Sequence, residues 1–378
     1  MFSAKAIEGI REGTRTGEPV RGPFDVQILP LTACNQACVF CPLYTVPEEI
    51  KRVHAPRFID SGKKMEWNIF ERIVNGLMEL GEVERVHFTG GEPLLHPRIA
   101  DMTAAFKTAF PHSTVAIVTN GVLLVDRFDE LAAGGVDRIS ISINAADERT
   151  YLRLSPSNRA QDFRKLIEGL KRVGNRKREI RGKRRHSVPE IALTCVLTRY
   201  NYGQVAELFE IATIANADSL TFIPIVPFEF EGTSRNTSFA VTKDQFEKFL
   251  DDIRKFAPQA EEKGLWLGYG GNEADGGILK LKPSDIPNPC YAGYSFIVFW
   301  PDGTIRPCCN CEMVMGDIFR QNLAEIWHST QYREFRSKAR SGDFPSEMRC
   351  SCNECGYLYE NRFFRTSVKS EKIENNHL

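Results

Sequence analysis

Three cysteines, Cys34, Cys38 and Cys41, are the residues of this sequence whose type and spacing most directly indicate chemistry. They follow the apolar run 24–31, and their spacing allows all three thiols to approach one inorganic centre. Thiolates are favoured ligands of iron–sulfur clusters, and a cubane held by only three cysteines keeps one iron free for another ligand. Free cysteines are often buried core residues and zinc sites usually contain paired Cys-x-x-Cys motifs, so the tight clustering favours a [4Fe–4S] cluster.

The same segment resembles the signature of the radical S-adenosylmethionine superfamily, in which Cys-x3-Cys is followed by an apolar residue, an aromatic residue and a third cysteine. Phe40 is the aromatic residue here. The resemblance implies that the free iron binds S-adenosylmethionine, and that one electron cleaves this cofactor to methionine and a 5′-deoxyadenosyl radical. The radical abstracts hydrogen from a substrate. Because the cluster must be reduced, we expect a flavodoxin or ferredoxin as partner.

Six β-rich runs alternate with helical segments in the N-terminal part of the chain. They span residues 24–31, 83–89, 114–119, 137–143, 190–198 and 219–226. Regular βα alternation predicts an α/β fold with a parallel sheet covered by helices. The pattern alone leaves a closed barrel and an open sheet as alternatives, and the family resemblance favours an open, partial (βα)6 TIM barrel.

Polar residues follow several predicted strands, where ligands gather in parallel α/β folds. After the second strand, two glycines permit a close backbone approach, and Glu92 offers a carboxylate to an ammonium group. A Gly-Gly pair alone is more often a structural turn, but here it matches the Gly-Gly-Glu motif with which the family holds the amino group of S-adenosylmethionine. For Arg153, the alternative to a cofactor contact is an ordinary exposed charge on a helix. The cofactor contacts that the resemblance implies are Phe40, Thr89, Gly90, Gly91, Glu92, Asn120, Ser142 and Arg153.

Seven of the eleven cysteines lie between residues 290 and 355. The turn Pro301-Asp302-Gly303 predicts a hairpin of strands 295–300 and 304–307 that delivers cysteines to one place. Such clustering indicates zinc or a second iron–sulfur cluster. The pattern resembles the SPASM or shortened twitch extension of radical S-adenosylmethionine enzymes, which implies an auxiliary [4Fe–4S] cluster. The expected ligands of one auxiliary cluster are Cys290, Cys308, Cys352 and Cys355, and the remaining cysteines leave a different ligand set or a second cluster open.

The cysteines outside the proposed ligand sets help to decide which type of reaction the enzyme performs. A substrate radical either loses an electron and becomes oxidised, or regains hydrogen from a donor such as a thiol and becomes an epimer. Cys195 is most simply a core residue. Because an auxiliary cluster is a natural electron acceptor, we expect two-electron oxidation. The candidate hydrogen donors for the alternative are Cys195, Cys309, Cys311 and Cys350.

Composition shifts divide the chain into five segments. We expect an N-terminal extension over 1–23, the partial barrel over 24–236, a bridging helix and Gly-rich linker over 237–285, the auxiliary-cluster domain over 286–365 and a polar tail over 366–378. The βα rhythm is expected to break at the bridge, where glycines accumulate.

The charges balance, with 49 basic and 49 acidic residues, so no global field attracts nucleic acid or an anionic membrane. The chain has neither a signal-peptide core nor an apolar run long enough to span a bilayer, and we expect a cytoplasmic protein. The run 171–186 contains nine basic residues and one acid, Glu179. Without aromatic residues for base stacking, it is expected to be a solvated loop, with a dock for an acidic electron carrier as the alternative.

The expected function is that of an enzyme acting on a small polar molecule such as a sugar or aminocyclitol, because the short N-terminus has no room for a leader-binding module. A peptide-modifying enzyme, which crosslinks or epimerises its substrate, is the principal alternative. A redox-neutral epimerase and a non-catalytic iron–sulfur carrier are further alternatives. A carrier, however, has no use for a tri-cysteine site beside a Gly-Gly-Glu motif.

Overall fold

The computed structural model describes residues 2–41, 63–156, 158–183, 188–225, 229–230, 233–234, 237–270, 290–309, 311, 313–341 and 357–369. Three of the predicted functional cysteines lie outside these residues, namely Cys350, Cys352 and Cys355.

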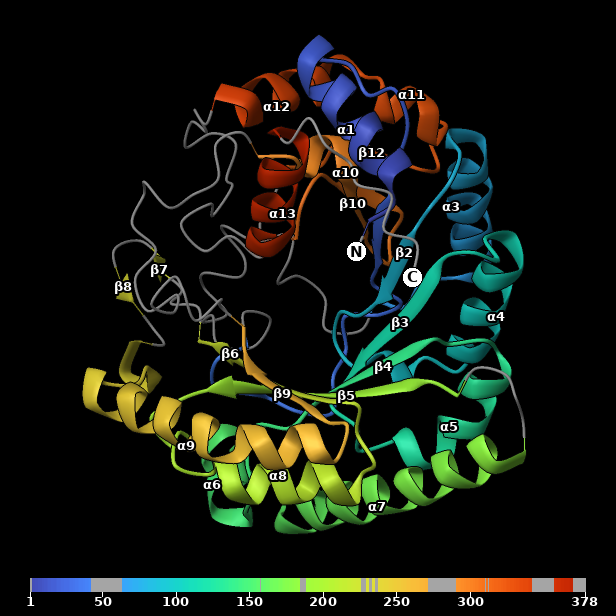
Figure 1. Cartoon of the computed structure of the whole chain (residues 1–378). Coiled ribbons are helices and arrows are strands. Elements are labelled where there is room, and N and C mark those ends of the chain that lie inside the picture. The colour runs from blue at the N-terminus through green and yellow to red at the C-terminus, as the bar shows by residue number, and fades with distance from the viewer. Residues whose placement is uncertain are drawn as a thin grey trace.

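In the described part of the chain, one sheet of ten strands forms the centre of the fold (Figure 1). Its strands are β1 (Asp25–Ile28), β2 (Arg85–Phe88), β3 (Thr114–Thr119), β4 (Arg138–Ser142), β5 (Glu190–Leu197), β6 (Ser219–Pro224), β9 (Trp266–Tyr269), β10 (Phe296–Phe299), β11 (Thr304–Arg306) and β12 (Gly316–Asp317). Their spatial order is β12-β11-β10-β1-β2-β3-β4-β5-β6-β9. Neighbours from β1 to β6 pair in parallel, which confirms the six predicted strands and the α/β fold.

Helices cover the convex side of the sheet, and a second group packs around β10 (Figure 1). The helices are α1 (Ala4–Thr16), α3 (Trp67–Leu80), α4 (Ile99–Ala109), α5 (Leu124–Ala133), α6 (Glu148–Leu154), α7 (Ala160–Lys183), α8 (Val205–Ile214), α9 (Lys243–Glu262), α10 (Ala292–Ser295), α11 (Leu323–Trp327), α12 (Thr330–Ser341) and α13 (Leu358–Lys369). Short 3-10 turns lie at Pro93–Leu95 and Thr237–Phe239, and β7 (Glu229–Phe230) pairs with β8 (Thr233–Ser234).

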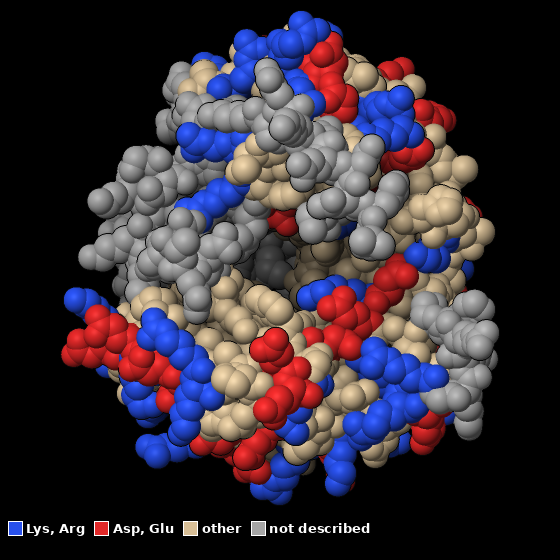
Figure 2. Space-filling view, in the orientation of Figure 1, with Lys and Arg blue, Asp and Glu red and all other residues tan. Residues whose placement is uncertain are grey.

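The two faces of the sheet differ because side chains alternate along each strand. On β2, Val86 and Phe88 are fully buried in the main core against the helices, whereas Arg85 and His87 project to the opposite, concave side. The same alternation places Ser140 and the other half-buried polar residues of the central strands on that side. Figure 2 shows the molecule hollowed at its centre, over this concave face. The fold therefore presents polar strand residues to an open interior.

The expected break in the βα rhythm after residue 236 is wrong. Helix α9 is followed by β9, which pairs in parallel with β6 and places Trp266 opposite Ser219. The α9–β9 unit was not predicted because its glycines suggested a linker. Gly264 has a φ of +64° just after α9, and Gly268 leaves room for an indole ring, since a Cβ there would lie 2.3 Å from the ring of Trp266. The sheet thus gains one more parallel strand.

The C-terminal segment extends this same sheet. Strand β10 pairs in parallel with β1, with Phe296 opposite Asp25, and the predicted β10–β11 hairpin is confirmed. Its turn requires Gly303, whose φ is +83°. The main core accordingly contains both Val26 from β1 and Trp327 from α11. The predicted domain boundaries remain predictions, but the barrel and the auxiliary segment share one core.

The predicted solvated loop at 171–186 is also wrong, because residues up to Lys183 belong to α7. Lys177 takes a core position of this helix. Its side chain is fully buried, and its Nζ binds the carboxylate of Asp218 and, at 3.0 Å, the carbonyl of Asn216. In the described part of the chain, no helix is long and apolar enough to cross a membrane.

Candidate active site

The cysteine segment leaves the carboxyl end of β1 and lies against the loop that follows β2. Gly91 donates its N–H to the carbonyl of Leu31 at 3.1 Å, and Glu92 donates to the carbonyl of Ala33 at 2.8 Å. Gly90 has a φ of +125°, which only glycine adopts readily. A Cβ on Gly91 would lie 2.0 Å from the Ala33 carbonyl oxygen. The glycine pair therefore allows the cysteine segment to lie directly on this backbone.

Glu92 is buried and already fully engaged by the protein. One carboxylate oxygen accepts from the Thr119 hydroxyl at 2.6 Å and from the backbone N–H of Leu94 at 3.1 Å. The other accepts from the backbone N–H of Asn120 at 2.7 Å. Burial raises the pKa of Glu92, while these hydrogen bonds oppose that rise. The carboxylate thus fastens the loops after β2 and β3 together, and its predicted contact with S-adenosylmethionine remains a prediction.

Asn120 connects β3 to the first cysteine. Its amide nitrogen donates to the side-chain oxygen of Asn35 at 2.6 Å and lies 3.8 Å from the sulfur of Cys34. That sulfur also accepts from the backbone N–H of Gln36 at 3.4 Å. Burial, with the nearby Glu92 and Cys38, raises the pKa of Cys34 to about 11. Without metal Cys34 is therefore a neutral thiol at pH 7, and metal binding must displace its proton.

The end of helix α6 supports the second cysteine. The sulfur of Cys38 lies 3.1 Å from the hydroxyl of Ser155, and burial raises the pKa of this thiol. Val39 donates its N–H to the carbonyl of Leu154 at 2.9 Å.

Tyr151, one turn earlier, accepts from the amide of Gln36 at 2.9 Å and from that of Asn158 at 2.7 Å. The sequence contains no motif for these supports, and they were not predicted. They hold the cysteine segment from the side opposite Gly91.

The chemistry of the three cysteines fits an iron–sulfur cluster that keeps one iron free. All three are half-buried cysteines on one segment. The sulfur of Cys34 accepts from the N–H of Gln36, and that of Cys38 lies 3.1 Å from the hydroxyl of Ser155, contacts of the kind that tune cluster thiolates. Among the described residues, no three His, Cys, Asp or Glu side chains already converge at metal-binding distance.

The other predicted cofactor contacts lie around this segment with less definite roles. Thr89 donates its backbone N–H to Ile28 at 3.0 Å, Phe40 is half-buried, and Ser142 is half-buried at the end of β4 on the concave face. The guanidinium of Arg153 packs over the ring of Tyr200, 4.6 Å from its centroid. Their contacts with a cofactor remain predictions.

The described cysteines of the C-terminal segment come from its hairpin and from the residues before it. The sulfur of Cys290 accepts from the side chain of Asn361 on α13 at 3.6 Å. Cys308 and Cys309 have sulfurs 4.0 Å apart, and Cys311 is disulfide-bonded. The roles of Cys309 and Cys311 as hydrogen donors remain predictions. The proposed auxiliary ligand set is not tested, because half of it lies outside the described residues.

Cys195 faces the helix layer. It alternates on β5 with Thr194 and Val196 and belongs to the main core, with no exposed surface. Its sulfur accepts from the side chain of Asn201 at 3.4 Å, and burial raises the pKa of the thiol. The geometry disfavours Cys195 as a hydrogen donor, since the concave face lies on the other side of the sheet.

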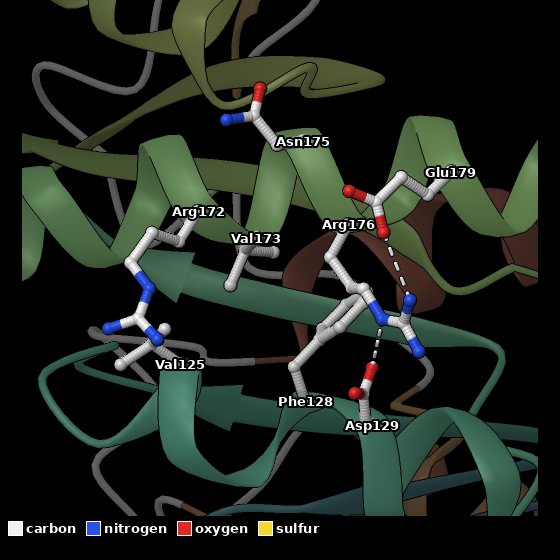
Figure 3. Close-up of a pocket in the computed structure, with 8 residues that line it drawn as sticks. All are labelled: Val125, Phe128, Asp129, Arg172, Val173, Asn175, Arg176 and Glu179. Carbon is white, nitrogen blue, oxygen red and sulfur yellow. Dashed lines mark hydrogen bonds and ion pairs between the residues drawn. The ribbon is translucent and has the colours of Figure 1, made fainter.

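A surface pocket of about 300 Å³ lies between α5 and α7, within the basic run (Figure 3). Arg176 binds Asp129 at 2.8 Å and Glu179 at 3.0 Å, and Arg172 stands apart from these acids. Helix α7 begins next to the cysteine support Ser155, and a rise of about 1.5 Å per residue puts the pocket roughly 18–28 Å farther along the helix. This distance disfavours the pocket as the place where an electron carrier reduces the cluster.

Two family models match the chain. The model of the radical SAM superfamily matches residues 28–182, and the model of the SPASM iron–sulfur cluster-binding domain matches residues 290–356. The first range contains the cysteine segment with its supports, and the second contains the C-terminal cysteines. The two resemblances expected from the sequence are confirmed.

Curated relatives match to different extents. A GTP 3′,8-cyclase of Chlorobaculum tepidum is 29% identical over 145 residues, and the chain spans only 40% of that relative's length. The tungsten-containing aldehyde ferredoxin oxidoreductase cofactor-modifying protein of Pyrococcus furiosus is 24% identical over 347 residues, 86% of each chain. The PqqA peptide cyclase of Gluconobacter oxydans is 25% identical over 304 residues, 78% of this chain and 75% of the cyclase.

Solved structures share the fold. SuiB of Streptococcus suis, bound to S-adenosylmethionine, superposes with a TM-score of 0.62 at 18% identity, covering 94% of this chain and 77% of SuiB. The enzyme anSMEcpe with the same cofactor superposes with a TM-score of 0.61 at 16% identity, covering 92% and 93%. Together with the matched domains, these similarities establish the partial barrel with its C-terminal extension. The chain therefore belongs to the radical SAM superfamily and is an enzyme of this superfamily with a C-terminal SPASM domain.

Proposed function

We propose that this enzyme abstracts a hydrogen atom from a neutral polar group held on the concave face of the sheet, and that the substrate is oxidised by two electrons. One observation carries the proposal. Several half-buried polar side chains on that face have no hydrogen-bond partner among the described residues, which leaves them free to bind a ligand. These side chains are Gln27, Ser140, Thr194 and Thr221.

Among the described residues, the charged side chains on the concave face of β1, β2, β4 and β5 are paired with each other. Asp25 binds Arg85, and Arg138 binds Glu190 at 2.6 Å, at the amino ends of their strands. A charged substrate group placed beside the uncharged side chains would lose water without gaining an ion pair. The arrangement therefore favours hydroxyl or amide groups, such as those of a sugar, an aminocyclitol or a neutral amino-acid side chain.

In the proposed mechanism, Cys34, Cys38 and Cys41 would hold the cluster, which together with S-adenosylmethionine would supply radical chemistry for hydrogen abstraction. The protein's part is positioning. Glu92 and Asn120 fix the cysteine segment at the carboxyl ends of β2 and β3, above the polar residues of the concave face. Oriented binding of this kind lowers the entropic barrier to a reaction between two bound groups. A flavodoxin or ferredoxin in the cytoplasm is the proposed electron source, and one auxiliary [4Fe–4S] cluster is proposed for the SPASM domain.

A peptide substrate is the second candidate, and the comparisons support it. One relative is named as a peptide cyclase. SuiB has been solved with its precursor peptide SuiA, at a TM-score of 0.63, and anSMEcpe with the Cp18Cys peptide, at 0.59. The free hydroxyl and amide groups of the concave face suit a neutral residue of a peptide as well as a small molecule.

The test compares the native chain with a Cys34→Ala/Cys38→Ala/Cys41→Ala variant. Reduced by dithionite without oxygen, the native enzyme should convert S-adenosylmethionine to 5′-deoxyadenosine, and the variant should not. The variant should retain about four irons if the SPASM domain holds one cubane. Robust deoxyadenosine formation by the variant would refute the site. Its absence from the native enzyme would favour the iron–sulfur carrier, and a product that lacks two hydrogen atoms would identify oxidation.

A further inference from the structure

A histidine and a buried aspartate on the concave face have no part in holding the cysteine segment. The register of β1 and β2 places Asp25 opposite Arg85 and Gln27 opposite His87, so His87 is the diagonal neighbour of Asp25. The Nε2 atom of His87 lies 3.3 Å from Oδ1 of Asp25. Within the described part of the chain, this oxygen has no other polar partner.

Asp25 is held as a carboxylate. It is 2% exposed, and its other oxygen accepts from Arg85 and, at 3.3 Å, from the hydroxyl of Tyr357. Burial opposes ionisation, but His87 and Arg85 outweigh it and hold the pKa of Asp25 below its usual value. A carboxylate only accepts hydrogen bonds, so the proton of a neutral His87 belongs on Nε2. Its Nδ1 then carries a free lone pair.

That Nδ1 atom is available on the concave face. The His87 side chain is 35% exposed, and its Nδ1 has no partner among the described residues. His96 provides a contrast within the same chain. It is 2% exposed, its Nε2 lies 3.1 Å from the carbonyl of Met65, and its Nδ1 accepts from the N–H of Arg98 at 3.2 Å. His96 is thus a structural histidine, whereas His87 keeps one nitrogen free.

We propose that Nδ1 of His87 accepts the proton that the substrate loses during oxidation, and that Asp25 is its positioning residue. The inference rests on the proposed function. After hydrogen abstraction, the carbon radical bears a hydroxyl group; the O–H bond breaks, its proton moves to Nδ1, and a C=O bond forms. One electron leaves at the same time and requires an acceptor of the iron–sulfur class. Among the described concave-face residues, His87 presents a basic ring nitrogen, Nδ1, that has no hydrogen-bond partner.

The C-terminal segment takes part in positioning this pair. Tyr357 donates to Asp25 and also lies 3.3 Å from the hydroxyl of Ser295, and Glu360 binds Arg85 at 3.3 Å. The next residue, Asn361, donates to the sulfur of Cys290, one of the proposed auxiliary ligands. One short stretch of chain therefore contacts both the carboxylate behind the proton acceptor and the proposed electron-accepting centre.

The first test measures the tautomer of His87 in the full, cluster-loaded and oxidised chain labelled with ¹⁵N-histidine. The native protein should show His87 predominantly protonated on Nε2, with Nδ1 unprotonated. Asp25→Asn should reduce the Nε2–H tautomer to about half or less, because an amide no longer selects it. The control Asp101→Asn, on exposed α4, should change nothing. An Nδ1–H tautomer in the native protein would overturn the proposal.

A second measurement needs no substitution that could disturb folding. Diethyl pyrocarbonate acylates accessible, unprotonated imidazoles, and mass mapping assigns each site. His87 should react severalfold faster than buried His96, with exposed His112 as the reactive reference. A His87 as inert as His96 would refute an accessible proton acceptor. The same preparations are assayed for deoxyadenosine: its absence from the native enzyme refutes the proposed function, whereas its presence with an inert His87 refutes only this inference.

Discussion

Replacing Gly91 by alanine should remove the cluster of the cysteine segment and leave the SPASM domain loaded. A Cβ at this position would lie 2.0 Å from the carbonyl oxygen of Ala33 and 2.6 Å from that of Thr32. Ordinary contacts begin near 3.4 Å, so the two backbones must separate by more than about 1 Å. Both obstructing atoms are backbone and cannot rotate away like a side-chain end. Overpacking of this kind costs about 1–3 kcal/mol, and here it displaces the segment that carries Cys34.

The measurement is iron per chain, together with deoxyadenosine formation under dithionite. With one cubane in each domain, native protein should contain about eight irons and Gly91→Ala about four, with deoxyadenosine formation lost. The matched control is Gly203→Ala, where a Cβ meets nothing within 4 Å, and this variant should behave as native. If Gly91→Ala kept its full iron content and activity, the close approach would not be what positions the cysteine segment.

Two further substitutions test buried groups of the barrel. Lys177→Ala should destabilise the chain by about 2 kcal/mol, because it removes the buried charged partner of Asp218, which keeps Arg181 and the N–H of Ile191. Urea unfolding should show no more than about 0.5 kcal/mol for the exposed control Lys171→Ala, and equal effects would contradict the core role of Lys177. Cys195 should resist iodoacetamide in the folded chain, since burial raises its thiol pKa, and Cys195→Ala should keep deoxyadenosine formation. Rapid alkylation of Cys195 in the folded chain would contradict its buried position on the helix-covered face of the sheet.

The parts of the fold that follow simple periodicity were predictable from the sequence. Strands β1 to β6 all lie within the predicted runs, since each run combines β-branched residues with flanking turn residues. The cysteine segment and the hairpin turn at Gly303 were predictable as well, because spacing and turn chemistry are local. Strand β9 was missed because Gly268 and Gly270 suggested a linker, and pairing with β6 is a non-local property.

The second half of α7 was missed for a different reason. Its inward positions follow helical spacing at Val173, Lys177 and Ile180, but a lysine interrupts the apolar stripe. Only the fold shows that this lysine binds Asp218, the residue directly before β6. The supports Ser155 and Tyr151 and the pair Asp25–His87 were likewise unpredictable, because each depends on which segments meet in space.

The parallel pairing of β10 with β1 has a consequence for the synthesis and the truncation of this protein. Asp25 lies opposite Phe296, so the first strand finds one of its two neighbours only when most of the chain has been synthesised. Until then, β1 is an open edge with unpaired N–H and C=O groups, the kind of edge that recruits other strands and aggregates. A version truncated before residue 286 should therefore be poorly soluble, and long-range pairing of this kind is expected to slow folding. We therefore expect that neither the barrel nor the SPASM segment folds well when expressed alone.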